Sequence, residues 1–264
     1  MINDSQINAF ADEIYQALRN QTMIDPLSDR EPEMTIEDAY AVSSKLLEKR
    51  IDIDGEKVIG KKIGVTSKAV QNMLGVHQPD FGYLTDAMVA EEGEPLSITD
   101  KMIQPRAEGE IAFVLKKDLI GPGITATAVL QATDFIVPCF EIVDSRIKDW
   151  NIKIQDTVAD NASCGYFLLG QNAVSPSSVD LSTCGMVMEL NGQIVSTGAG
   201  AAALGSSPVS CVVWLANTLG KLGTPLKAGE VILSGSLVPL QPVKAGDYMA
   251  VSIGGVGRTA VRFV

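Results

Sequence analysis

Two glutamates, Glu108 and Glu110, lie near the start of an otherwise apolar run, PRAEGEIAFVL at residues 105–115. The run predicts a β-strand. Because side chains on a strand alternate between its two faces, both carboxylates are expected on the same face. At a separation of about 5 Å and an effective dielectric constant near 20, two such charges repel each other by roughly 3 kcal/mol. A fold that buries this strand must therefore offset the repulsion.

A third carboxylate, Glu141, lies inside another apolar run, FIVPCFEIVDSRI at residues 135–147. Three carboxylates that converge without a cation would have to take up protons. With Mg²⁺ or Mn²⁺ they would form a site of hard oxygen ligands that leaves positions open for water and substrate. The alternative is that they pair with Arg106 or Arg146. The combination of residues favours the metal site.

Lys62 is a candidate for acid–base chemistry. Lys62 and Lys61 lie on the predicted strand 58–65, VIGKKIGV, and point to opposite faces, so one of the two is expected to point inward. A buried lysine near a cation has a lowered pKa and can give or take a proton, whereas the alternative is a lysine at the surface. Asp80 lies in HQPDFGYL, which predicts a turn where aspartate often makes only local hydrogen bonds.

Composition excludes several classes of function. The chain has a single histidine, His77, so a histidine-rich zinc site or a two-histidine mechanism cannot form within one chain. A net charge of −11 without a run of Lys or Arg argues against a nucleic acid or an anionic membrane as partner. The acidic start resembles no signal peptide, and the four scattered cysteines indicate reduced thiols. A cytoplasmic protein is expected.

The pattern of apolar residues predicts an α+β protein in two parts. Residues 1–55 are expected to form a helical N-terminal segment, with a capping box at Thr35 that opens a helix, and to serve as scaffold or oligomer contact. Residues 56–264 consist mostly of short apolar runs between Gly, Pro and Asn-Gly turns, which predicts a mixed, mainly antiparallel β domain. A hairpin is expected at Asn191-Gly192, and one further helix at 208–223.

Several stretches, in the same order, resemble the fumarylacetoacetate hydrolase superfamily. They are GKKIGVTSKAVQNMLGV, QPDFGYL, IQPRAEGEIAFVL, DWNIKIQDTVADNASCG and AGEVILSG…AGDYMAVSIGGVG. The resemblance runs from about residue 30 to the end and is strongest to the branch of hydratases and decarboxylases that act on 2-oxo or 2-enol acids. It implies a β-roll preceded by helices, with Mg²⁺ or Mn²⁺ held by Glu108, Glu110 and Glu141.

The resemblance also implies roles for residues around this metal. Lys62 and Asp80 are expected to be catalytic, and Ser163, Ser234 and Gly235 to bind substrate. Gly109 stands where such sequences are expected to carry Ala or Val, and it is expected to loosen the strand locally.

The function implied by the resemblance is that of a hydratase in the meta-cleavage catabolism of aromatic compounds. It would convert 2-hydroxypenta-2,4-dienoate to 4-hydroxy-2-oxopentanoate, with the substrate chelating the metal through its carboxylate and C2 oxygen. A 4-oxalocrotonate decarboxylase with the same site and a β-diketone or acylpyruvate hydrolase are alternatives. From a different class, the chain could be a non-catalytic scaffold subunit. A homo-oligomer that associates with the pathway's partner hydratase or decarboxylase is also implied.

Overall fold

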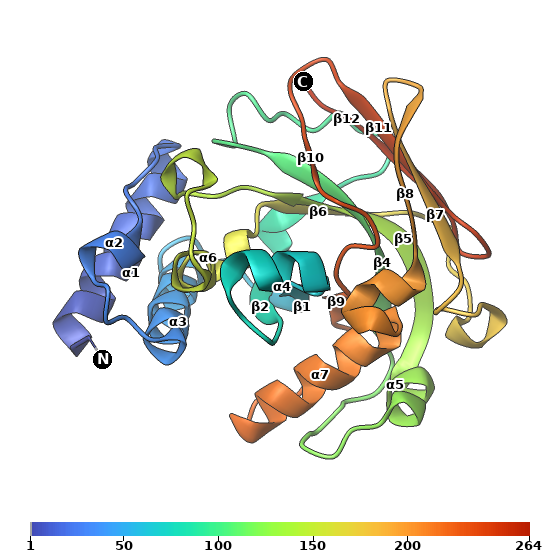
Figure 1. Ribbon diagram of the computed structural model, residues 1–264, viewed down its shortest axis with the longest axis horizontal. Helices are drawn as coiled ribbons and strands as arrows, with labels where there is room; N and C mark the ends of the chain where they lie inside the picture. Colours follow the sequence, from blue (N-terminus) through green and yellow to red (C-terminus); the bar gives the residue numbers. More distant parts are fainter. Residues whose placement is uncertain (1) are drawn as a thin grey trace.

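Three helices open the chain in the computed structural model, which describes residues 2–264 (Figure 1). They are α1 (Asp4–Asn20), α2 (Leu27–Arg30) and α3 (Ile36–Asp52). α3 begins at Thr35, whose hydroxyl accepts a hydrogen bond from the Asp38 N–H at 3.1 Å, while the Asp38 carboxylate accepts from the Thr35 N–H at 3.0 Å. This confirms the predicted capping box.

The N-terminal helices are anchored to the rest of the molecule by α6 (Ile154–Ala159), a helix from the middle of the chain. An apolar cluster that includes Ile14 of α1, Leu46 of α3 and Val158 of α6 holds the three together. Figure 1 shows α1 and α3 side by side at one end of the molecule, with α6 between them and the β-structure. The division into two domains at residue 55 stays a prediction.

The body of the structure is a strongly curled, mixed sheet of eight strands in the order β2-β1-β9-β4-β5-β6-β3, with β10 paired to β4. The pairs β1–β9 and β3–β6 are parallel and the others are antiparallel. The strands are β1 (Val58–Gly64), β2 (Asp80–Thr85), β3 (Val89–Ala90), β4 (Arg106–Leu115), β5 (Thr133–Val143), β6 (Tyr166–Leu169), β9 (Val231–Leu233) and β10 (Gln241–Pro242).

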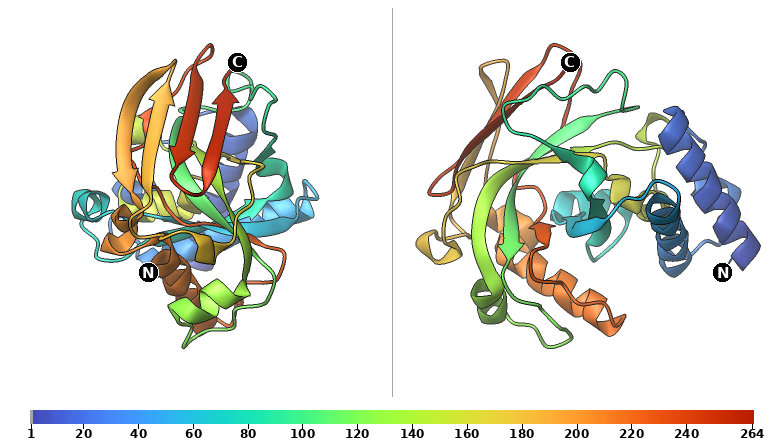
Figure 2. Two further views of the ribbon diagram at one scale, coloured as in Figure 1. Left: turned by 90° about the vertical axis from the view of Figure 1, so that its right-hand side faces the viewer. Right: turned by 180° about the vertical axis from the view of Figure 1, so that it is seen from behind.

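A second, antiparallel sheet of four strands packs against β5, as Figure 2 shows from the side. Its strands, in the order β12-β11-β7-β8, are β7 (Gly185–Leu190), β8 (Gln193–Ala199), β11 (Tyr248–Ile253) and β12 (Gly257–Arg262). β7 and β8 form the predicted hairpin, with Asn191 and Gly192 both at positive φ as its tight turn requires.

Three further helices complete the fold: α4 (Lys68–Leu74), α5 (Ala126–Ala132) and α7 (Pro208–Lys221). α7 agrees with the helix predicted at 208–223 and packs with α5 against the main core. Helices and mixed sheet together confirm the α+β class. Among residues 2–264, no helix is both long and apolar enough to cross a membrane.

Gly109 lets the two sheets approach each other closely. β4 stays in register with β5 through this position, with Gly109 opposite Phe140, so the expected local loosening of the strand is wrong. A Cβ atom on Gly109 would lie 2.9 Å from Cγ2 of Val251 and 3.0 Å from Sδ of Met186, both on the second sheet. The glycine is therefore a requirement of packing.

Replacing Gly109 by valine is expected to lower the free energy of unfolding by about 1–3 kcal/mol, because the added atoms overpack the contact with Val251 and Met186. Chemical denaturation followed by circular dichroism measures the change. The control is Gly185→Val on β7, where an added Cβ meets nothing within 4 Å and valine suits the strand. Equal stability of the two variants would contradict this account.

Candidate active site

Three glutamates converge on one face of the adjacent strands β4 and β5. Glu108 is directly opposite Glu141 in the antiparallel register, and Glu110 lies two residues further along the same face. One carboxylate oxygen from each residue lies within 4.8 Å of the others. Glu110 and Glu141 are fully buried, whereas Glu108 keeps part of its surface exposed. Glu108 is therefore the most accessible of the three glutamates.

Ionisation of all three carboxyl groups at once is strongly unfavourable in this cluster. Burial, reinforced by the charge of Glu141, raises the pKa of Glu108 to about 7. Burial and the two neighbouring carboxylates raise the pKa of Glu110 well above its ordinary value. Burial also raises the pKa of Glu141, although the Lys62 ammonium opposes this. The carboxylates must bind protons or a cation.

The residues present fit a divalent cation. Among the described residues, Glu110 Oε1 and both carboxylate oxygens of Glu141 are buried and have no hydrogen-bond partner. Carboxylate oxygens are the ligands that Mg²⁺ and Mn²⁺ prefer. The alternative of pairing with arginine is wrong: Arg146 pairs with Asp160, and the Arg106 guanidinium lies over the Trp150 ring.

The site lies where β9 ends between β1 and β4. The last residue of β9, Leu233, is level with Lys62 on β1 and with Ala112 on β4. Beyond it the chain leaves the sheet, and the Gly235 N–H donates a 2.8 Å hydrogen bond to Oε2 of Glu110. A positive φ of 93° at Gly235 gives the chain this direction.

Lys62 and Asp80 lie together at the β1–β2 side of this gap. The Lys62 ammonium is 3.2 Å from Oε1 of Glu141. A Cβ atom built on Gly64 would lie 2.2 Å from Asp80 Oδ1 and 3.3 Å from Lys62 Nζ, which places both side chains around one point. The structure thus brings a cationic and an anionic side chain to the edge of the carboxylate cluster.

Electrostatics make the proton affinity of Lys62 depend on its neighbours. Burial lowers its pKa, but the Glu141 carboxylate outweighs burial and the pKa is raised. The lowered pKa expected beside a cation therefore requires that the carboxylates be neutralised. Burial raises the pKa of Asp80, while the Lys62 charge lowers it.

Two details of these segments differ from the sequence expectation. Lys61 is buried as well as Lys62, because Glu230 forms an ion pair with it at 2.6 Å on the opposite face of the strand. Asp80 is the first residue of β2, paired with Gly64, and does not lie in a turn. The Pro and Gly residues around it made the segment look like a turn.

Ser163 and Ser234 are both buried and already have partners. The Ser163 hydroxyl forms a 3.1 Å hydrogen bond with the Thr157 hydroxyl, and the Ser234 hydroxyl donates to the carbonyl of Ile111. Ser163 ends a run of three residues at positive φ, Asn161–Ser163, a strained turn typical of functional sites. Substrate binding by Ser163, Ser234 and Gly235 stays a prediction.

Cys164 also contacts this site, although the sequence suggested only a structural thiol. Burial raises its pKa, and the nearby Lys62 charge opposes that rise. In the sequence, the feature that could have indicated this is its position directly after Ser163 in the stretch DNASCG. All four cysteines are free and buried.

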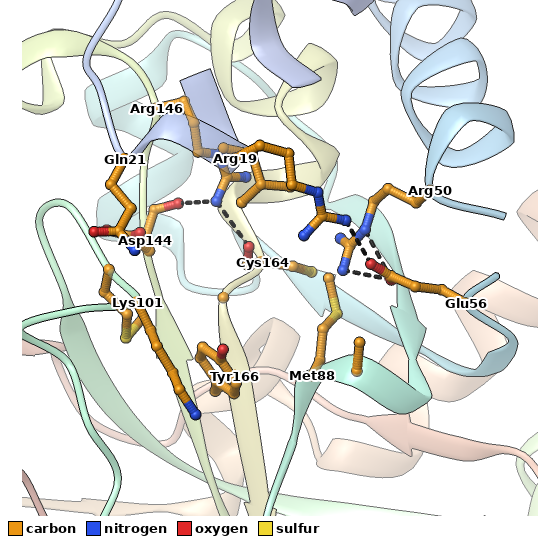
Figure 3. A pocket seen from close by; sticks show the side chains of 14 residues that line it. Arg19, Gln21, Arg50, Glu56, Met88, Lys101, Asp144, Arg146, Cys164 and Tyr166 are labelled. Carbon is orange, nitrogen blue, oxygen red and sulfur yellow. Dashed lines mark hydrogen bonds and ion pairs between the residues drawn. The ribbon is translucent and has the colours of Figure 1, made fainter. Parts of the chain in front are cut away.

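A cavity of about 240 Å³, lined in part by Cys164, lies between the N-terminal helices and β6 (Figure 3). Its three arginines have anionic partners within the protein: Arg19 and Arg50 pair with Glu56, and Arg146 pairs with Asp160. The Lys101 ammonium lies over the Tyr166 ring.

Comparison with known proteins places this geometry in a family. The sequence model of the C-terminal domain of fumarylacetoacetate (FAA) hydrolase matches residues 60–264. A 2-hydroxypent-2,4-dienoate hydratase of Pseudomonas putida is 67% identical over 217 residues, covering 82% of this chain and 97% of its own. A 2-hydroxyhexa-2,4-dienoate hydratase of Comamonas testosteroni is 58% identical, covering 95% and 94%.

A solved structure extends the match to the whole fold. The 4-oxalocrotonate decarboxylase from Pseudomonas putida G7, complexed with magnesium and adipate, has a TM-score of 0.95 and 37% sequence identity, covering 100% of this chain and 99% of its own.

We expect the affinity for Mn²⁺ to rise by about tenfold per pH unit between pH 6 and 7, because a carboxyl with a pKa of about 7 must release its proton to become a ligand. Titration calorimetry measures the affinity. Glu110→Gln is expected to weaken binding by about 100-fold or more, whereas the exposed Glu91→Gln leaves it unchanged. Binding independent of pH, or intact in Glu110→Gln, would refute the metal site.

In the presence of EDTA, raising the pH from 5 to 8 is expected to lower the melting temperature by roughly 5 °C. The folded-state pKa of Glu108 is above its unfolded value, so the folded protein binds more protons between these two values and loses stability as the pH rises through about 7. Differential scanning calorimetry measures this slope, and Glu108→Gln should flatten it. An equal slope in that variant would exclude Glu108 as a source.

Proposed function

Since the chain belongs to the fumarylacetoacetate hydrolase family, we propose that it is a hydratase that adds water to 2-hydroxypenta-2,4-dienoate and gives 4-hydroxy-2-oxopentanoate. The observation that carries this proposal is 67% identity to a 2-hydroxypent-2,4-dienoate hydratase across 97% of that protein. The reaction belongs to the meta-cleavage catabolism of aromatic compounds, and cytoplasmic location fits it.

The rival reaction, decarboxylation of 4-oxalocrotonate, is less well supported. The decarboxylase of solved structure is 37% identical, whereas the two hydratases are 67% and 58% identical. Both reactions need negative charge to be stabilised at C2 of a 2-oxo acid, so one fold can serve both. A scaffold role would not need the buried cluster of Glu108, Glu110 and Glu141.

We propose that these three glutamates hold one Mg²⁺ or Mn²⁺. When bound, the cation supplies Lewis-acid stabilisation of negative charge on the carboxylate and C2 oxygen of a chelating 2-oxo acid. Glu110 is fixed by the Gly235 N–H and Glu141 by the Lys62 ammonium, so two of the three ligands are oriented by this chain. Oriented ligands are typical of metal sites that act in catalysis.

Lys62 and Asp80 are proposed to move the protons of the reaction. Hydration requires a proton at C5, which gives the α,β-unsaturated ketone, then water at C4 and a proton at C3. A buried lysine and a buried aspartate around one point can exchange protons with a substrate held beside them. Asp80 is also proposed to orient the attacking water, and Ser163 to contact the substrate.

Assembly of the chain is a separate proposal. We propose a homo-oligomer, alone or in association with the partner hydratase or decarboxylase of the same pathway. Gel filtration with light scattering tests the oligomer directly.

We expect fast loss of the ultraviolet absorbance of 2-hydroxypenta-2,4-dienoate with Mg²⁺ or Mn²⁺, and loss of this activity in EDTA. The product should be 4-hydroxy-2-oxopentanoate, identified by nuclear magnetic resonance. No turnover by protein with bound metal, together with CO₂ release from 4-oxalocrotonate, would favour the decarboxylase.

Lys62→Met is expected to lower kcat by 10²- to 10⁴-fold while Mn²⁺ still binds, because it removes a proton-transfer group and not a ligand. Lys61→Met is the matched control: it changes an equally buried neighbour on the opposite face and should keep kcat within a few-fold. Full kcat in Lys62→Met, measured with metal bound, would remove Lys62 from the mechanism.

A further inference from the structure

Tyr40 brings a side chain of the N-terminal helices to the acid–base end of the site. It lies in the second turn of α3. Its ring stacks on the ring of Phe81, with the centroids 4.4 Å apart and the planes inclined by 15°. Phe81 directly follows Asp80 on β2 and is paired with Ile63, the neighbour of Lys62. The aromatic stack is therefore one residue away from both proposed proton carriers.

The hydroxyl of Tyr40, and not only its ring, has a partner here. The Phe81 backbone N–H donates a hydrogen bond to this hydroxyl at 3.3 Å. The hydroxyl keeps its own proton for a second bond. The adjacent Asp80 has a buried Oδ1 for which the described part of the chain supplies no hydrogen-bond partner.

The charge of Asp80 also acts on the Tyr40 hydroxyl. Burial raises the pKa of Tyr40, and the Asp80 carboxylate raises it further. The hydroxyl therefore stays protonated, as a neutral donor beside an anion.

A purely structural explanation accounts for the ring but not for the hydroxyl. Tyr40 packs against both the N-terminal cluster and the main core, and a phenylalanine would fill that space equally well. A hydroxyl costs free energy to bury unless it is hydrogen-bonded. Here its bond goes to the backbone immediately after Asp80.

We propose that Tyr40 is a positioning residue of the hydratase: its hydroxyl holds the β2 backbone at Phe81 and thereby fixes the Asp80 carboxylate for proton transfer. The inference rests on the proposed function and deepens it. It makes α3, which the sequence suggested was scaffold or oligomer contact, part of the active site.

The test is Tyr40→Phe, which keeps the ring and removes the hydroxyl. We expect kcat for 2-hydroxypenta-2,4-dienoate to fall about tenfold or more, with KM within twofold and with the melting temperature and Mn²⁺ affinity close to wild type. Tyr166→Phe is the matched control, because it removes a half-buried hydroxyl from the cavity of Figure 3 and should leave kcat unchanged.

A second readout does not depend on hydration. Exchange of the C3 hydrogens of 2-oxopentanoate in D₂O with Mn²⁺, followed by nuclear magnetic resonance, reports proton transfer next to a chelated carbonyl. Tyr40→Phe should slow this exchange about tenfold or more. If the wild type exchanges these hydrogens but does not hydrate the dienoate, the proposed function is wrong. The role of Tyr40 is then still tested by comparing the exchange rates of Tyr40→Phe and wild type.

Three outcomes would overturn the inference. The first is equal kcat and equal exchange in Tyr40→Phe and wild type. The second is a rise in KM that matches the fall in kcat, with a lower melting temperature, which would indicate lost packing. The third is a wild type that catalyses neither hydration nor exchange.

Discussion

Repulsion among three buried carboxylates is the constraint on which the rest of this structure depends. The register of β4 against β5 puts Glu108 opposite Glu141, and the strand period then puts Glu110 on the same face. A slip of one residue would turn both glutamates of β4 into the contact between the sheets, where Gly109 lies now. One register thus sets both faces of β4: it brings the carboxylates together on one side and allows close packing of the sheets on the other.

The neighbours of the cluster follow from the same constraint. Lys62 approaches Glu141, and the Gly235 N–H approaches Glu110, so each fully buried carboxylate receives one positive or donating group. These groups reduce the repulsion without removing it, since the pKa values of all three carboxyls remain raised. A site that was fully neutralised by the protein would have no remaining affinity for a cation.

Features set by local sequence could be predicted, and features set by distant partners could not. The cap at Thr35, the hairpin at Asn191 and the common face of Glu108 and Glu110 follow from spacing within a few residues. The burial of Lys61 depends on Glu230, 169 residues further along the chain. Likewise, the requirement for glycine at position 109 depends on a second sheet whose strands come later in the sequence. The hydroxyl of Tyr40 meets a backbone amide 41 residues away, and no periodicity of α3 indicates that contact.

The insertion of β9 between β1 and β4 has a consequence for how the protein is made. The strand that carries Lys62 and the strand that carries the glutamates are joined in the sheet through residues 231–233. On the ribosome, Lys62, Glu108 and Glu110 are all synthesised long before residues 231–233. Until then, the repulsion between the glutamates of β4 is not offset, and burial of this strand in a core is unfavourable. Assembly of the carboxylate cluster with Lys62 is thus a late event of folding, dominated by contacts between distant parts of the chain, and such topologies fold slowly.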